Sequence, residues 1–99
     1  MNNLHIITPV KDSLDTTLKT IECISIAEKS FSANYTIYND FSSEETTENL
    51  TASASKFDYE IINLKAITTH PSPNYLLVLQ LAQKKALSDG AHLLIIESD

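Results

Sequence analysis

Short apolar runs alternate with longer amphipathic segments along this chain of 99 residues. Four of the runs are rich in β-branched, aromatic or aliphatic side chains and predict β-strands over residues 4–8, 34–38, 59–64 and 92–96. The third run contains polar positions, which are typical of an edge strand. The fourth is apolar throughout, which is typical of a strand covered on both faces, so we expect it at the centre of a sheet.

Three segments between these runs have the spacing of amphipathic helices, and they span residues 14–29, 42–55 and 73–87. The expected N-terminal caps are Asp12 or Ser13, then Ser42 with Glu45 as a capping box, then Ser72 followed by Pro73. Asp89-Gly90 is a typical stop for the third helix. That helix carries apolar side chains around more than one face, which predicts either burial on more than one side or a partner surface outside this chain, such as a second copy.

The order of these elements, βαβαβαβ, favours a parallel sheet with helices on both faces. We therefore expect an α/β fold with a Rossmann-like three-layer α/β/α arrangement and a four-stranded parallel sheet, formed by residues 1–99 as a single domain. Because the chain ends directly after its most apolar predicted strand, we expect it to be a truncated N-terminal part of a longer domain.

Composition excludes several classes of function. Thirteen acidic residues against seven lysines give a net charge of −6, and the chain has no arginine. Without the bidentate donor that dominates phosphate and guanine recognition, nucleic acid is not expected as a partner. The single glycine, Gly90, cannot form a Gly-rich dinucleotide loop or a P-loop. No apolar run approaches the ~20 residues of a transmembrane helix.

The single cysteine, Cys23, cannot form an intramolecular disulfide, and the N-terminus lacks the basic and apolar regions of a signal peptide. We therefore expect a cytoplasmic protein or, in a longer form, one peripheral to the inner face of a membrane. Cys23 is expected as a small buried side chain of the first helix. The three histidines are far apart in the sequence and do not predict a zinc site.

Candidate chemistry lies at the carboxyl ends of the predicted strands, where ligands bind in open parallel sheets at the point of reversed winding. These ends are Thr8-Pro9-Val10, Asn39-Asp40 and Glu97-Ser98-Asp99. Their acidic side chains would meet on one rim, where a hard divalent cation could hold a diphosphate that this negative protein would otherwise repel. The alternative is that they are solvated residues at loop starts, where Asp and Asn favour turn geometry.

Four segments together resemble family 2 glycosyltransferases of the GT-A fold. Residues 6–13 (IITPVKDS) are similar to the family's opening strand and loop, and residues 37–46 (IYNDFSSEET) to its V-V-D-D-G-S-x-D-x-T segment. Residues 78–86 (VLQLAQKKA) are similar to its A-x-N-x-G-x-x-x-A helix, and residues 94–99 (LIIESD) to its strand ending in D-x-D. The segments follow the family's order and spacing, and the resemblance extends over essentially the whole chain, from residue 6 to residue 99.

The resemblance implies transfer of a sugar from a nucleotide diphosphate sugar, such as a UDP-linked donor, to a hydroxyl of a glycan or other acceptor, with Mn²⁺ or Mg²⁺. By the same resemblance, the nucleotide-sugar site comprises Thr8, Pro9 and Val10 around the base, Asp40 as acceptor for the uracil N–H, and Glu97 facing the ribose or donor sugar, with Asp99 as metal ligand. In the family the general base and acceptor site follow D-x-D. We therefore expect the base beyond Asp99 and no activity from these 99 residues alone.

Some residues depart from the family pattern: Asn39 replaces an Asp, Phe41 a Gly or Asn, and Glu97 the first Asp of D-x-D. These replacements keep open a non-catalytic or regulatory α/β domain. A receiver-like signalling module is a further alternative, since it also holds magnesium at strand ends. It needs paired acids after the first strand and an Asp after the third, whereas this chain has Thr8-Pro9 and Leu64-Lys65 there.

Overall fold

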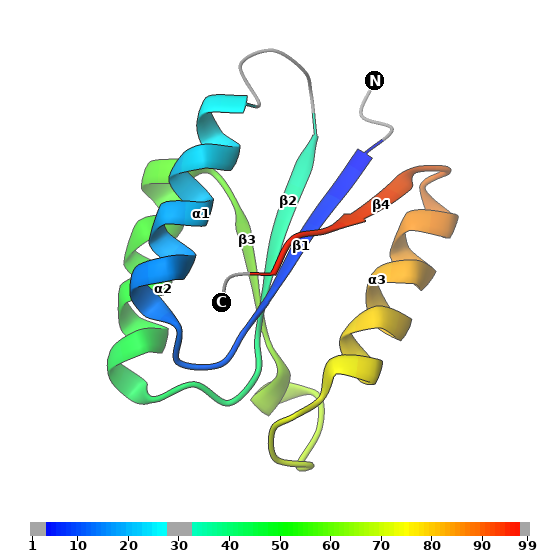
Figure 1. Cartoon of the computed structure of the whole chain (residues 1–99). Helices are drawn as coiled ribbons and strands as arrows, with labels where there is room; N and C mark the ends of the chain where they lie inside the picture. Colours follow the sequence, from blue (N-terminus) through cyan, green and yellow to red (C-terminus); the bar gives the residue numbers. More distant parts are fainter. Residues whose placement is uncertain (1–3, 28–32, 98–99) are drawn as a thin grey trace.

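The computed structural model describes residues 4–27 and 33–97, which form four strands, three α-helices and a short 3₁₀-helix (Figure 1). The strands are β1 Leu4–Val10, β2 Asn34–Asn39, β3 Glu60–Asn63 and β4 His92–Ile95. The helices are α1 Leu14–Ala27, α2 Glu44–Phe57, the 3₁₀-helix η1 Leu64–Ala66 and α3 Tyr75–Ser88. The predicted succession of strands and helices is confirmed.

The four strands form one sheet in the order β3-β2-β1-β4, and every neighbouring pair is parallel. Helices α1 and α2 lie over one face of the sheet and α3 lies over the other (Figure 1). The chain adds β2 and β3 on one side of β1, and α3 then carries it back to place β4 on the other side. The predicted Rossmann-like three-layer fold is confirmed, and the winding reverses at β1.

Side chains that alternate along the strands build a separate core on each face of the sheet. Ile6 and Ile37 face α1 and α2, where Leu50 of α2 is fully buried. Ile7 faces α3 and packs with Val78. Because both faces are covered, β1 lacks the polar alternation of a half-exposed strand.

The position of β4 differs from the prediction, which placed this strand at the centre. β4 lies at the edge of the described sheet and pairs only with β1 there. Leu93 and Ile95 pack towards α3, but Leu94, on the opposite face, is 44% exposed. An apolar run indicates that a strand packs against a core, but it does not indicate whether another strand pairs with its far side. The prediction that β4 is a central strand was therefore wrong for the described sheet.

β1 is also longer than predicted and continues through Pro9, which pairs with Tyr38 of β2. Proline lacks the N–H that a sheet interior normally requires. The N–H of Ile96 donates to the carbonyl of Ile7 (2.9 Å), so the backbone groups of Ile7, and of Pro9 two residues later, face the β4 side. β4 ends at Ile95, opposite Ile7, so Pro9 leaves no described strand without a hydrogen bond.

The cap of α2 is Ser43 instead of the predicted Ser42. Ser43 Oγ accepts the backbone N–H of Thr46 at 3.3 Å. Ser42 is used elsewhere, because its Oγ accepts the backbone N–H of Asp12 at 2.9 Å and so ties the loop after β2 to the loop after β1. The helix continues to Phe57, two residues beyond the predicted end.

Helix α3 begins at Tyr75 after Asn74, and Pro73 precedes the helix instead of starting it. Its predicted stop is confirmed, since Gly90 follows Asp89 with a φ of +64°, a backbone conformation that favours glycine. The predicted end of the first helix, residues 28 and 29, lies outside the described residues.

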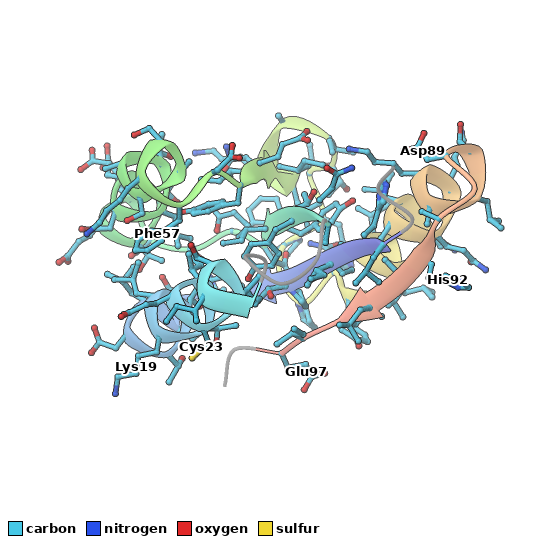
Figure 2. All side chains as sticks on the ribbon, turned by 90° about the horizontal axis from the view of Figure 1, so that it is seen from above. Lys19, Cys23, Phe57, Asp89, His92 and Glu97 are labelled. Carbon is cyan, nitrogen blue, oxygen red and sulfur yellow. The ribbon has the colours of Figure 1, made fainter. Side chains whose placement is uncertain are left out.

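The exposure of side chains on α3 and α1 tests two further predictions. Leu76 and Leu87 of α3 are 69% and 73% exposed, so part of the broad apolar surface of this helix is uncovered in the described chain. Cys23 is exposed on α1, and the expectation of a buried cysteine was wrong (Figure 2). Its position on α1 lies beside Ile24, which is the residue that turns into the core.

Candidate functional site

The carboxyl ends of the strands meet around a crevice of about 350 Å³. Six of its lining residues come from four separate parts of the chain: Pro9 and Val10 from β1, Asp40 after β2, Ser72 and Pro73 before α3, and Glu97 after β4. We call this site the crevice. It lies between the ends of β1 and β4, on either side of the point where the winding reverses, which is where open α/β sheets bind ligands.

Asp40 is the organising residue of the crevice. Its side chain is 7% exposed. Oδ2 accepts the backbone N–H of Asn74 at 2.7 Å and the hydroxyl of Ser72 at 3.0 Å, and Oδ1 accepts Nδ2 of Asn74 at 2.9 Å. Three hydrogen bonds therefore attach the segment before α3 to the end of β2. A carboxylate has about four acceptor positions, so it retains capacity for one more donor.

Asn74 extends this network to His70. Its Nδ2 also donates to the carbonyl of His70 at 2.8 Å, and its Oδ1 lies 3.2 Å from Nδ1 of the same histidine. Asn74 is itself buried. Because one amide joins Asp40 to His70, the segment that forms a wall of the crevice is fixed at both of its ends.

The structure separates the residues predicted to surround a nucleotide base. Pro9 lines the crevice. The side chain of Thr8 is fully buried, and its Oγ1 accepts the hydroxyl of Tyr35 at 2.7 Å. Val10 also lines the crevice, but its side chain belongs to the core under α1 and α2, and its carbonyl accepts the N–H of Asp40 at 2.8 Å. Thr8 and Val10 therefore shape the end of β1 from within the protein.

Two acidic site residues, Glu97 and Asp99, were predicted at the end of the last strand, and the structure describes the first of them. Glu97 lines the crevice, and its side chain points outward from the segment after β4 (Figure 2). Asp99, the predicted metal ligand, lies outside the described residues.

Five lining residues were not predicted as site residues from the sequence: Lys11, Ser13, Ser72, Pro73 and Tyr75. Tyr75, the first residue of α3, lies at the crevice with 43% of its surface exposed. Lys11 brings a positive charge to the same site, where its Nζ lies 3.4 Å from Asp12 Oδ2 and donates to the carbonyl of Phe41. The sequence contained one signal for Tyr75, namely an aromatic residue shortly after the predicted helix start at Ser72-Pro73.

The loop beside Lys11 is held by Asp12. The backbone N–H of Ser43 donates to Asp12 Oδ1 at 2.6 Å, and this hydrogen bond is the main reason that the pKa of Asp12 is lowered from its ordinary value. Asp12 has a φ of +59°. The hydrogen bonds with Ser42 and Ser43 fix this unusual backbone next to the crevice.

Two residues that depart from the glycosyltransferase pattern have clear structural roles. Asn39 is 4% exposed, and its Nδ2 donates to Thr47 Oγ1 (2.8 Å) and to Asn63 Oδ1 (2.9 Å). Phe41 adopts a φ of +58°, the left-handed conformation that glycine takes most readily. The ring of Phe41 packs against the core under α3.

A divalent cation would need oxygen ligands, and Mg²⁺ is often held by one or two carboxylates together with substrate phosphates. Within residues 4–27 and 33–97, no group of three or more His, Cys, Asp or Glu side chains is placed to hold a metal. Glu97 makes no ion pair with another described residue, so its carboxylate is available at the crevice. It fits the role of one carboxylate ligand in such a shared site.

Comparisons with known proteins give no family assignment. No protein-family model matches the chain, and a search of curated proteins finds no match. In the part of the chain that the structure describes, no helix is long and apolar enough to cross a membrane.

Proposed function

We propose that the crevice binds a nucleotide diphosphate sugar, with a UDP-linked sugar as the donor, and that the protein acts in sugar transfer to an acceptor hydroxyl. The observation that carries this proposal is the convergence of Pro9, Asp40, Tyr75 and Glu97 on one crevice at the point of reversed winding. The resemblance of the same strand ends to family 2 glycosyltransferases supports it.

The lining has the chemistry that each part of such a ligand requires. Tyr75 supplies an exposed aromatic face on which a planar base can stack, and the ring of Pro9 adds apolar surface. Asp40 has capacity for one further donor, such as the imide N–H of uracil. A buried carboxylate accepts an N–H and repels a carbonyl oxygen, so this contact would favour a base with a donor at that position.

Charge explains why a cation belongs to the proposal. The chain has a net charge of −6, and Asp40 and Glu97 both line the crevice. Lys11 offers one positive charge to a diphosphate but is already shared with Asp12. A bound Mg²⁺ or Mn²⁺ would neutralise the diphosphate as it leaves. Glu97 is the described residue suited to hold it.

Strand order favours this proposal over a receiver-like module. Receiver domains have the order 2-1-3-4-5, in which the first strand lies between the second and the third. Here β1 lies between β2 and β4, and β3 pairs with β2. This is the 3-2-1-4 order of the nucleotide-binding Rossmann sheet.

The test is titration calorimetry of the full chain with UDP-glucose in the presence of MnCl₂ or MgCl₂. We expect saturable, metal-dependent binding. Tyr75→Ala should weaken it at least about 5-fold, because base stacking on an aromatic side chain contributes roughly 1–3 kcal/mol. The control is Leu76→Ala, the next residue of the same helix, which is 69% exposed and does not line the crevice. Absence of binding with either metal, or equal affinity of the two variants, would refute the proposal.

A further inference from the structure

A second cavity lies at the same edge of the sheet but on the side of α2. It has a volume of about 630 Å³ and is formed where β2 and β3 end, between the first two turns of α2 and η1. In Figure 1 the start of α2 and η1 lie at the same end of the molecule. We call it the α2 cavity. None of its lining residues lines the crevice, so it is a separate site.

The floor of the α2 cavity is fixed by hydrogen bonds. Asn39 is almost fully buried and donates to both Thr47 and Asn63, which line the cavity with it. Asn39 Oδ1 in turn accepts the backbone N–H of Ser42 at 3.3 Å. The end of β2, the end of β3 and the second turn of α2 are therefore held in one arrangement before any ligand arrives, which lowers the entropic cost of binding.

The walls of the α2 cavity carry charges of both signs. Glu44 and Glu48 are four residues apart on α2 and so lie on one face of it, while Lys65 belongs to η1. Within the described residues, these three side chains form no ion pair with one another or with any other group. The hydroxyl proton of Thr47 and the Nδ2 group of Asn63 likewise have no acceptor among the described residues.

This set of groups selects a ligand class. The carboxylates of Glu44 and Glu48 would repel a bare anion. A bare cation would be attracted by these two carboxylates but repelled by Lys65, so only a neutral ligand meets no like charge in the cavity. Carboxylates accept hydrogen bonds only, whereas an ammonium and an amide NH₂ donate them, and a hydroxyl group can serve both kinds of partner. The side chain of Phe41 adds apolar surface for C–H groups.

From these observations we infer that the α2 cavity is a binding site for a neutral sugar. The hydroxyls of the sugar donate to Glu44 and Glu48 and accept from Lys65 and Asn63, and its ring packs near Phe41. The volume lies within the usual range of small-molecule sites, roughly 300–1,000 Å³. The inference concerns a site apart from the crevice, so it stands or fails independently of nucleotide binding.

The test is a ¹H–¹⁵N NMR titration of the full chain with methyl α-D-glucoside and with N-acetylglucosamine. Because the groups are exposed and few, we expect weak saturable binding with a dissociation constant on the order of 1–10 mM. Amide shifts should be centred on Thr47, Asn63 and Lys65. Glu48→Gln should weaken binding at least about 3-fold, since a charged acceptor makes stronger hydrogen bonds than a neutral one.

Glu45→Gln is the matched control, because Glu45 is exposed on the same helix and does not line the α2 cavity. It should leave sugar affinity unchanged. Glycine, a zwitterion, and inorganic phosphate, an anion, serve as competitors that carry charged groups, and neither should cause a saturable shift at the three reporter residues. The inference is overturned if neither sugar gives saturable shifts at these residues, if both variants behave alike, or if glycine or phosphate binds there in place of the sugars. A parallel titration with UDP reports on the crevice alone.

Discussion

The hydrogen-bond network around Asp40 predicts a large effect of substituting one buried polar residue, Asn74. Its substitution by alanine removes two donor bonds of Nδ2, to Asp40 Oδ1 (2.9 Å) and to the carbonyl of His70 (2.8 Å), but keeps the backbone N–H bond to Asp40. A hydrogen bond to a charged group contributes about 1.5–3 kcal/mol, and one to a carbonyl about 0.5–1.5 kcal/mol. Water from the crevice can replace part of this, so we expect a loss of roughly 2–3 kcal/mol in the free energy of unfolding.

Urea denaturation followed by circular dichroism measures this loss, and thermal melting should show a decrease in Tm of roughly 10–20 °C for a domain of this size. The matched control is Asn49→Ala. Asn49 also donates from Nδ2 to a carbonyl, that of Glu45 at 2.8 Å, but it is exposed on α2, where alanine favours the helix. Its variant should stay within about 0.5 kcal/mol of the original protein. A cost below about 1 kcal/mol for Asn74→Ala, or equal costs for both variants, would show that the network does not hold the crevice.

Three further predictions test other parts of the fold. Leu50→Ala should cost about 2–5 kcal/mol, because Leu50 is fully buried, while Leu87→Ala, at a position 73% exposed, should cost little; chemical denaturation compares the two. Burial raises the pKa of Tyr59 to about 12, so its neutral form stabilises the fold below pH 10. Unfolding experiments should show that the free energy of unfolding falls by about 2–3 kcal/mol as pH rises from 10 to 12. The Tyr59→Phe variant should not show this loss. The Ser43 N–H lowers the pKa of Asp12, so NMR titration should find Asp12 protonating below the ordinary range, and a normal value would contradict that hydrogen bond.

The order and type of the elements could be predicted from the sequence because they depend on local periodicity. Their boundaries could not, because contacts between distant segments decide them. Ser42 has the chemistry of a helix cap but is taken by the N–H of Asp12, so α2 starts after Ser43. Asn74 precedes α3 because Asp40, 34 residues earlier, binds both its backbone and its side chain. The sequence pattern around each helix start does not include the distant partner, Asp12 for Ser42 and Asp40 for Asn74.

The candidate site was predictable only in part, for a related reason. The rule that ligands bind at strand ends points to Pro9, Asp40 and Glu97, and all three line the crevice. The same rule is silent on the connection before α3, which supplies Ser72, Pro73 and Tyr75. The rule also does not distinguish a strand-end residue whose side chain is exposed from a buried one. Thr8 is buried, and its hydroxyl oxygen accepts a hydrogen bond from Tyr35.

The double use of Asp40 determines which substitutions can test function. The carboxylate that is available to a ligand also holds the segment before α3 through Ser72 and Asn74, so replacing it changes the shape of the crevice together with its chemistry. Loss of binding in such a variant would not distinguish a lost contact from a lost wall. Tyr75 lies on the same wall but has no hydrogen bond to Asp40 and is 43% exposed. Its truncation removes contact surface and leaves the network in place, which makes it the residue through which recognition can be measured separately from folding.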